Sequence, residues 1–242
     1  MIRRISSAAE LEAAARQLVP DIFGGKILAL AESYSFSYPF ATFFAAERAL
    51  ICNYYGAGVL WGEADAECAE FAAAAGFGEL LMSGENYEKA FFGQPAAVDP
   101  VMSRSSGGES ADRAALRTDT PYEQVFDILK DGFDIRFEDW YPDACHAVRH
   151  GISTVYTLGE SALQRMFTQK GITLFSLVAV KKGRRGDGLG KRLVRAAAAD
   201  CPESRIYIIC EPHLCGFYES CGFIRDGEAA AVYFNNRKEI QT

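Results

Sequence analysis

Hydrophobic and polar positions in the second half of the chain follow the pattern of a regular series of strands and helices. Three apolar runs rich in β-branched and aromatic residues predict consecutive strands at 154–158, 162–167 and 172–181. These strands are followed by a helix, a strand, a short helix and a final pair of strands, at 188–199, 205–210, 213–221 and up to Phe234. Two helices come first, over 121–129 and over 137–149, and Pro142 is expected to open or kink the second. This order of elements predicts an α/β layer architecture.

The first half of the chain contains a second, smaller set of elements. A helix is expected over 7–18, where Ser6 or Ser7 caps the first turn and Glu10 follows near the third position. Aromatic and aliphatic runs predict strands at 40–46, 49–61 and 79–82. One further helix is expected over 64–75, where Gly76 ends it.

One segment differs in composition from the rest of the chain. Residues 103–118 are small, polar and charged, with paired glycines and no aromatic residue, which is typical of a linker or a mobile loop. The segment separates an N-terminal α/β domain over 1–102 from a C-terminal domain over 119–242. Two domains suit a chain of 242 residues, since single domains commonly have about 100 to 150 residues.

The net charge limits the classes of partner. The chain has 32 acidic and 25 basic residues and a formal net charge of −7, which argues against a main role in neutralising nucleic-acid phosphates. It slightly favours a small or cationic partner. Acidic residues follow Met1 where a signal peptide needs apolar ones, and no apolar run approaches the roughly 20 residues of a membrane span. We therefore expect a cytoplasmic protein that binds neither nucleic acid nor membranes.

The cysteines and histidines form no recognisable metal or disulfide pattern. The seven cysteines are odd in number and no two are spaced as Cys-x-x-Cys, which indicates reduced, mostly buried thiols. His146 and His150 are four residues apart, so one helix face could present both, but no carboxylate lies between them as in His-Glu-x-x-His. We expect no metal site.

The stretch from Ser176 to Leu193 carries the clearest chemical signal in the sequence. An apolar strand ends, a loop with three alternating glycines follows, and an amphipathic helix begins. Glycines allow sharp backbone turns and let an anion approach the exposed amides at the start of a helix. Neighbouring arginines and lysines add positive charge in an acidic protein. These features predict a phosphate-binding loop.

Two well-known phosphate loops do not fit this stretch. A Walker A loop would need glycine in place of Arg185 and serine or threonine in place of Arg192. The dinucleotide fingerprint would need its third glycine in place of Lys191. The pattern that does fit is Arg-x-x-Gly-x-Gly, formed by Arg185, Gly188 and Gly190.

At this loop the sequence resembles the GNAT superfamily of N-acetyltransferases. The resemblance implies an α/β (α+β) fold with a mixed, mostly antiparallel twisted sheet flanked by helices. It also implies that the loop binds the pyrophosphate of acetyl-CoA and that the preceding strand lines the pantetheine arm. The residues implied for these two roles are Arg185, Gly186, Asp187, Gly188, Leu189, Gly190 and Lys191 in the loop and Val178, Ala179 and Val180 in the strand.

A second segment, Gly216–Phe223, strengthens the resemblance. It reads Gly-Phe-Tyr-Glu-Ser-Cys-Gly-Phe and follows the loop, helix and strand at the distance seen in the family. Tyr218 matches the tyrosine that typically lies beside the cofactor sulfur, where a phenol protonates the departing CoA thiolate as general acid. Gly222 is expected to end the short helix as a left-handed cap. The resemblance covers about residues 120–240 and implies a small-molecule or peptide amine as the acceptor.

Some positions depart from the family pattern. Glu211 stands where many members have asparagine, Leu214 stands where many have alanine, and the common proline before the loop is absent. Because Glu211 follows an apolar strand, it is a candidate for the general base that deprotonates the acceptor amine. Other candidates, each also explained by a surface position, are Glu160, Glu138 and His150.

The N-terminal domain contains a weaker copy of the tyrosine segment. Glu70–Phe77 aligns with Gly216–Phe223, so that two phenylalanines and a glycine match and Ala72 stands at the tyrosine position. No glycine-rich phosphate loop lies upstream of this copy. Two interpretations stay open: a degenerate GNAT-like domain that has lost cofactor binding, or a chance match in an alanine-rich helix.

These patterns support three functions. The first is an acetyl-CoA-dependent N-acyltransferase in which an amine attacks the acetyl group directly, with Tyr218 as general acid. The second is a non-catalytic acyl-CoA-binding or sensing module of the same fold. The third is a nucleotide-phosphate binder. The sequence identifies neither the acceptor nor the oligomeric state.

Overall fold

The protein divides into two compact units, each with its own strands and core. The computed structural model describes residues 1–108, 110–201 and 203–234. Unit 1 comprises Met1–Pro100 and Gly227–Thr242, and unit 2 comprises Val101–Asp226.

The chain passes from one unit to the other inside two strands, β6 (Ala96–Ser105) and β11 (Ile224–Tyr233). The segment 103–118, expected as a linker, therefore begins within a strand, and its residue 109 lies outside the described residues. The polar residue Ser103 has no exposed surface and accepts hydrogen bonds from Nε and Nη2 of Arg205, at 3.1 and 2.9 Å. A buried strand that contains such polar residues has the composition of a loop. For this reason the sequence predicted a linker where the end of a strand lies.

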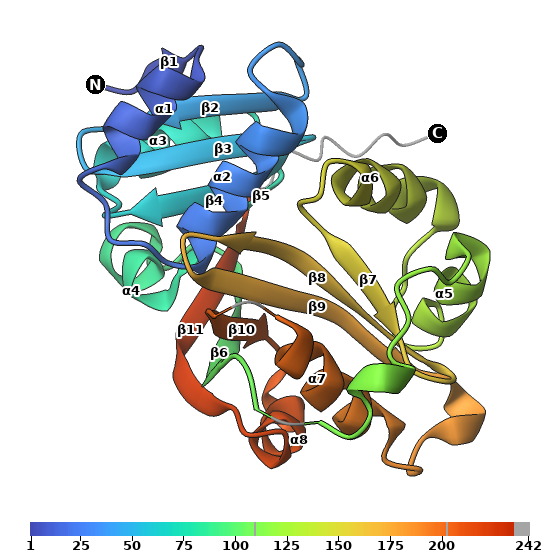
Figure 1. The fold of residues 1–242 in the computed structure, drawn as a ribbon. Coiled ribbons are helices and arrows are strands. Elements are labelled where there is room, and N and C mark those ends of the chain that lie inside the picture. The colour runs from blue at the N-terminus through green and yellow to red at the C-terminus, as the bar shows by residue number, and fades with distance from the viewer. Residues whose placement is uncertain (109, 202, 235–242) are drawn as a thin grey trace, which may run out of the picture. The chain divides into compact units, whose positions relative to one another are not determined.

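Unit 2 is built on a sheet with the strand order β6-β10-β9-β8-β7 (Figure 1). The bounds of its other strands are β7 (Thr154–Thr157), β8 (Ser161–Gln169), β9 (Ile172–Val180) and β10 (Arg205–Ile209). Neighbouring strands are antiparallel, except that β9 and β10 are parallel. A parallel pair needs a crossover connection, which helix α7 (Leu189–Asp200) provides. The expected mixed, mostly antiparallel sheet flanked by helices is confirmed.

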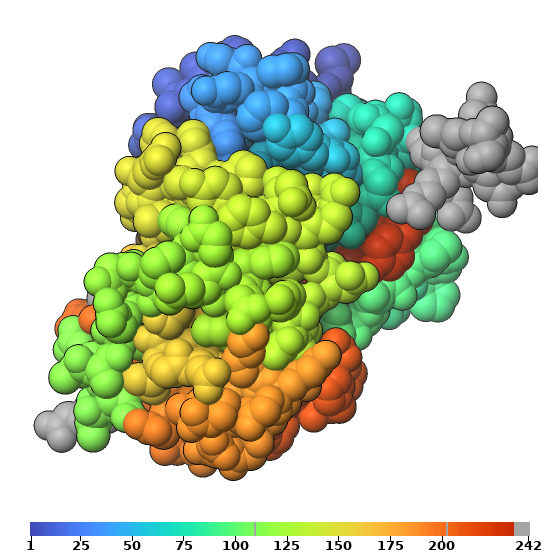
Figure 2. Space-filling view, turned by 90° about the vertical axis from the view of Figure 1, so that its right-hand side faces the viewer, coloured from blue at the N-terminus to red at the C-terminus, as the bar shows by residue number. Residues whose placement is uncertain are grey.

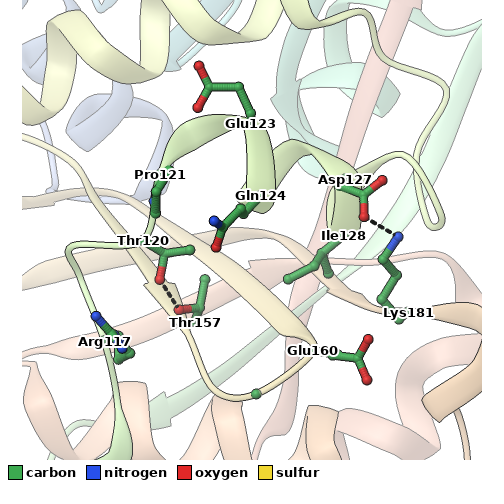
Figure 3. A pocket seen from close by; sticks show the side chains of 11 residues that line it. Arg117, Thr120, Pro121, Glu123, Gln124, Asp127, Ile128, Thr157, Glu160 and Lys181 are labelled. Carbon is green, nitrogen blue, oxygen red and sulfur yellow. Dashed lines mark hydrogen bonds and ion pairs between the residues drawn. The ribbon is translucent and has the colours of Figure 1, made fainter.

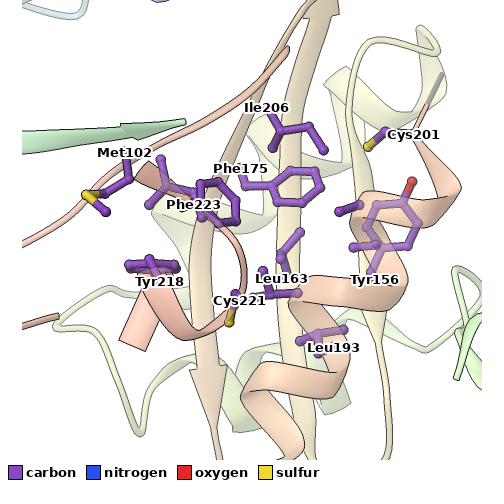
Figure 4. Close-up of a cluster of buried hydrophobic side chains, with 14 of the residues drawn as sticks. Met102, Tyr156, Leu163, Phe175, Leu193, Cys201, Ile206, Tyr218, Cys221 and Phe223 are labelled. Carbon is purple, nitrogen blue, oxygen red and sulfur yellow. The ribbon is translucent and has the colours of Figure 1, made fainter. Parts of the chain in front are cut away.

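Helices cover both faces of this sheet. Besides α7 they are α5 (Tyr122–Leu129), α6 (Phe137–Arg149), which continues through Pro142, and α8 (Cys215–Ser220). Successive strand residues point to opposite faces, and accordingly Val155 and Ala162 pack with α5 and α6, whereas Tyr156 and Leu163 pack with α7 and α8 (Figure 4). The core of unit 2 thus lies in two layers, one on each side of the sheet.

Unit 1 has a sheet with the order β1-β2-β3-β4-β5-β11. The bounds of these strands are β1 (Arg3–Ile5), β2 (Ala41–Ala45), β3 (Ala49–Tyr54), β4 (Ala57–Gly62) and β5 (Glu79–Ser83). Here β4 and β5 are the parallel pair, and the other neighbours are antiparallel. The helices are α1 (Ala8–Ala15), α2 (Ile22–Tyr34), α3 (Ala66–Ala74), and α4 (Gly84–Asn86), which a π-helical turn over Tyr87–Phe91 continues.

Both units follow one connectivity. Two helices precede three antiparallel strands, a crossover helix leads to a parallel strand, and a short helical segment comes next. In each unit the last strand of the parallel pair also has an antiparallel neighbour, and this neighbour comes from the other half of the chain. β11 pairs with β5, and β6 pairs with β10. This shared order agrees with the expectation of a degenerate GNAT-like N-terminal half, which stays a prediction.

Two strand predictions were wrong. Residues 49–61 form a hairpin of two strands, because Tyr55 and Gly56 both have positive φ, 50° and 86°, and turn the chain between β3 and β4. The final pair of strands is a single strand, β11, which runs through Gly227 without a turn.

Helix α2 was not predicted, because Gly24 and Gly25 lower the helix propensity of its first turn. In the structure Asp21 caps this turn, with Oδ1 accepting from the Gly24 amide at 2.7 Å. Gly24 faces the ring of Trp61 so closely that an added Cβ would lie 2.4 Å from Cε2. The glycine therefore allows α2 to pack on β4. Although α2 is among the longest helices with 13 residues, no helix in the described part of the chain is long and apolar enough to span a membrane.

Candidate functional site

Strand β9 has a free backbone edge at its carboxyl end. Its pairing with β10 ends at Leu174 and Tyr207, whereas β9 continues to Val180 and stays paired with β8. Leu177 has a positive φ of 52°, and the β8–β9 register shifts there, which marks a β-bulge. Among the described residues, no strand pairs with residues 175–180 on the β10 side. An extended ligand arm can therefore bind to this edge as an added strand does.

The loop that follows β9 leads into a helix start with free amides. Gly186 and Gly188 have φ values of 93° and 75°, and a Cβ on either would meet no atom within 4 Å. These two glycines are therefore needed for backbone conformation. Helix α7 begins with Gly188 as N-cap and has no side-chain cap. Its first amides thus point out of the helix without an intrahelical acceptor, which is the arrangement that binds phosphate groups.

The third glycine of the loop has a different role. Gly190 is buried, and an added Cβ would lie 3.2 Å from Val180 Cγ2 and 3.3 Å from Phe217 Cζ. It lets the first turn of α7 lie against both the end of β9 and α8. The free strand edge, the helix start and the tyrosine helix are thereby brought together at one place.

Charged side chains of the loop bind to neighbouring segments. Arg185 donates from Nε to the Val180 carbonyl at 3.3 Å and from Nη2 to the Asp131 carbonyl at 2.5 Å. Arg184 pairs with Asp187 at 2.7 Å and with Glu160 at 3.0 Å. Arg185 therefore holds the loop against the end of β9 and the turn after α5. The loop itself is exposed, as the orange surface beside the green α5 shows (Figure 2).

Tyr218 lies within the core layer of α7 and α8 (Figure 4). Its side chain is 6 % exposed, and its ring meets those of Phe217 and Phe223 edge to face at 4.9 and 5.8 Å. Burial raises the pKa of the Tyr218 phenol well above its usual range, and the nearby Cys210 and Cys221 add to this effect. The phenol is therefore held protonated, as a proton donor requires. Gly222 has a φ of 90° directly after α8, so the expected left-handed cap is confirmed.

The candidate bases lie at the surface. The side chain of Glu211 is 71 % exposed, and its Oε2 lies 3.3 Å from Nδ1 of His213. Glu160 is 52 % exposed and pairs with Arg184. Glu138 and His150 are exposed on α6. The structure places none of these four in the buried layer that contains Tyr218, and the base stays a prediction.

A cavity of about 890 Å³ adjoins the loop (Figure 3). It lies between α5 and the turn that joins β7 to β8, and Lys181, the first residue after β9, forms part of its wall. Lys181 Nζ pairs with Asp127 at 2.5 Å, and the hydroxyls of Thr120 and Thr157 are 2.6 Å apart. This cavity was not predicted, because helix-surface residues and turn residues that are distant in the chain form it together.

Among the described residues, no group of three or more His, Cys, Asp and Glu side chains is arranged to hold a metal ion. The seven cysteines are free, and all except the half-buried Cys215 are buried.

Part of unit 2 is similar to a known protein family. A family model described as an acetyltransferase (GNAT) domain matches residues 147–225. This match covers about a third of the chain. The expected cofactor residues, together with Tyr218 and Glu211, lie within residues 147–225.

Relatives of known sequence or structure agree with this family. A probable glucosamine 6-phosphate N-acetyltransferase 2 from Oryza sativa subsp. japonica is 38 % identical over 60 residues, which are 24 % of this chain and 36 % of that protein. The chain thus matches about a third of the length of this curated relative.

Two solved structures share the fold over nearly the whole chain. A GCN5-related N-acetyltransferase from Kribbella flavida has a TM-score of 0.59 and 11 % identity, covering 89 % of this chain and 95 % of its own. A tandem GNAT protein from the clavulanic acid biosynthesis pathway has a TM-score of 0.55 and 11 % identity, covering 96 % and 98 %. At these identities the likeness concerns the fold, including that of the N-terminal half.

Proposed function

We propose that the protein is an acetyl-CoA-dependent N-acyltransferase whose cofactor site lies in unit 2. The observation that carries this proposal is the combination of a free β9 edge with the uncapped start of α7. The edge offers backbone donors and acceptors to the amide groups of a pantetheine arm, and the helix start offers amides to a pyrophosphate. Val178, Ala179 and Val180 belong to this edge, and residues 185–191 form the loop and the first turn of α7.

Arg185 acts here as a positioning residue. Its guanidinium donates to two backbone carbonyls, so its side chain orients the loop whose amides bind the phosphates. We expect Arg185→Ala to raise the KM for acetyl-CoA, because the loop loses its link to β9, and to leave kcat nearly unchanged. Steady-state kinetics at varied acetyl-CoA would measure this, and an unchanged KM would contradict the positioning role.

Acetyl-CoA supplies an acetyl group activated as a thioester. The neutral acceptor amine forms a bond from nitrogen to the acetyl carbon, the bond from that carbon to sulfur breaks, and the nitrogen loses one proton as the amide forms. The departing thiolate takes the phenolic proton of Tyr218, which burial has kept in place. Glu211, acting directly or through water, is the candidate that removes the proton from the amine.

The acceptor class is an amine of a small molecule or a peptide. The name of the rice relative makes glucosamine 6-phosphate a first member of the acceptor panel. Peptide termini, polyamines and aminoglycosides complete the panel, because the similarity covers only 36 % of the relative.

Two measurements test the proposal. In isothermal titration we expect acetyl-CoA and CoA to bind and ATP not to bind, and tight ATP binding without CoA binding would indicate a nucleotide-phosphate site instead. Thiol release from acetyl-CoA across the amine panel then tests turnover. Binding of acetyl-CoA with no thiol release for any amine would favour the alternative function, a non-catalytic acyl-CoA-binding module.

A further inference from the structure

Unit 1 has a cavity of its own at the carboxyl ends of β4 and β5, with a volume of about 640 Å³. These two strands are parallel, and open α/β sheets commonly bind ligands just beyond the carboxyl ends of such strands. The volume lies in the range of small-molecule sites. In the shared connectivity of the two units, this position corresponds to the β9–α7 connection of unit 2.

The unit 1 cavity lacks the features of a phosphate site. Only three residues, 63–65, connect β4 to α3, and none of them is glycine. The Asp65 carboxylate caps α3 by accepting from the Cys68 amide at 2.9 Å. Glu63, also in this connection, adds a negative charge to the cavity wall. An anionic ligand would therefore meet carboxylates at the place where unit 2 offers free amides.

Two carboxylates in the wall of the unit 1 cavity form no ion pair with a described residue. Arg48 and Lys89 both pair with Glu63, Lys89 at 3.3 Å. Asp21 and Glu85 also line the cavity, and neither forms an ion pair with any described residue. The wall thus carries three carboxylates and two cations, and both cations are taken by the same carboxylate.

Asp21 is the more buried of the two unpaired carboxylates. It follows the loop after α1 and caps α2 through Oδ1. Burial raises its pKa to about 6, and hydrogen bonds from the Gly24 and Phe23 amides only partly offset this effect. A buried carboxylate is stabilised when a cation is placed next to it. Asp21 lines the cavity, so a cationic ligand that binds there can pair with its carboxylate.

We propose that this unit 1 cavity is a binding site for a small aliphatic ammonium compound, with Asp21 as the main counter-charge and Glu85 as the second. The compound binds through charge-assisted hydrogen bonds from its N–H groups to the carboxylate oxygens. Two unpaired carboxylates suit a diammonium compound in particular. The proposal concerns unit 1 alone and does not depend on catalysis in unit 2.

Isothermal titration of the full chain with putrescine, a four-carbon diammonium compound, tests the site. The uncharged counterpart 1,4-butanediol serves as the control ligand. Asp21→Asn removes the charge and keeps the helix cap, since asparagine caps helices as well as aspartate. Asp65→Asn is the matched control variant, because Asp65 also caps a helix of unit 1 but does not line the cavity.

We expect saturable putrescine binding to the natural chain, with a Kd at least about tenfold higher in Asp21→Asn and unchanged in Asp65→Asn. Glu85→Gln should raise the Kd less, and 1,4-butanediol should not bind. Equal affinity of putrescine for the natural chain and Asp21→Asn would overturn the proposal, as would the absence of saturable binding. Since both variants retain their caps, circular dichroism should show native folds for each.

Discussion

The protonation of Tyr218 is determined by what surrounds its ring. The hydroxyl belongs to a side chain that is 6 % exposed among apolar neighbours, so its ionised form is disfavoured and its pKa is raised. A phenol in solution ionises near pH 10. Absorbance at 295 nm follows the ionisation of tyrosine, and the difference between the natural chain and Tyr218→Phe isolates Tyr218. This difference should therefore develop only above pH 10.

The same side chain gives a kinetic prediction. We expect Tyr218→Phe to lower kcat for acetyl transfer about 100-fold or more, because general acids typically contribute at least this much. The Kd for acetyl-CoA should stay within about twofold, since phenylalanine keeps the ring in the core layer. Thiol-release kinetics would measure kcat, and isothermal titration with acetyl-CoA would measure the Kd. An unchanged kcat would contradict the acid role.

Asp21 gives a prediction about stability and pH. Its folded pKa of about 6 lies above the unfolded value near 4, so its contribution to stability is fully present below pH 4. That contribution is lost as the pH rises through 6. Relative to the natural chain, Asp21→Asn should gain about 2 kcal/mol of unfolding free energy between pH 4 and pH 7.5.

Urea unfolding at pH 4, 5, 6 and 7.5 measures this difference. Asp65→Asn is again the control, and its trend should have the opposite sign. Hydrogen bonding to the Cys68 amide lowers the pKa of Asp65, so its ionised form stabilises the folded state. A pH-independent difference for Asp21→Asn would contradict the assignment.

At the scale of elements, the start of α7 depends on one close contact. The Cβ added by Gly190→Ala would lie 3.2 Å from Val180 and 3.3 Å from Phe217, which pushes α7 away from β9 and α8. We expect the unfolding free energy to fall by about 1–3 kcal/mol and the Kd for acetyl-CoA to rise about tenfold. Calorimetry and titration would measure the two effects.

Gly183→Ala provides the control for this substitution within the same loop. Gly183 has no positive φ, and its added Cβ would meet no atom within 4 Å. Both stability and cofactor affinity should stay as in the natural chain. An equal loss in both variants would mean that loop flexibility, rather than the close contact, is what matters.

The elements that the sequence revealed are those whose own side chains show a period. The three strands before the glycine loop alternate between two buried layers, and the loop residues act through backbone conformation that glycine signals directly. Helix α2 was missed because its stability comes from the contact between Gly24 and Trp61, which are distant in sequence. The cavity beside Lys181 was missed for the same reason, since its walls come from separate elements.

At the scale of the whole molecule, the boundaries of the units follow strand partners rather than composition. The expected domain over 119–242 omits residues 101–105, which pair with β10 and place Met102 in the core of unit 2. It also includes residues 229–233, which pair with β5 of unit 1. Sequence composition does not reveal which strand a segment pairs with, so the boundary at 119 stays a prediction that truncation can test.

We expect a fragment of residues 96–226 to fold and to bind acetyl-CoA with a Kd within about threefold of the full chain. A fragment of residues 119–226 should aggregate, because β10 loses its antiparallel neighbour and exposes a strand edge and part of the core. Circular dichroism and titration would compare the two. Equal folding of both fragments would show that residues 101–105 are dispensable.

Each unit contains a strand from the other half of the chain, and this has a consequence for how the protein is synthesised. Residues 229–233, which complete the strands of unit 1, are translated after the whole of unit 2. Domains generally fold in the order in which they leave the ribosome, but unit 1 has to wait until unit 2 has been made, although most of unit 1 emerges first. For the same reason a gene cut within residues 103–118 would leave each unit without one of its strands.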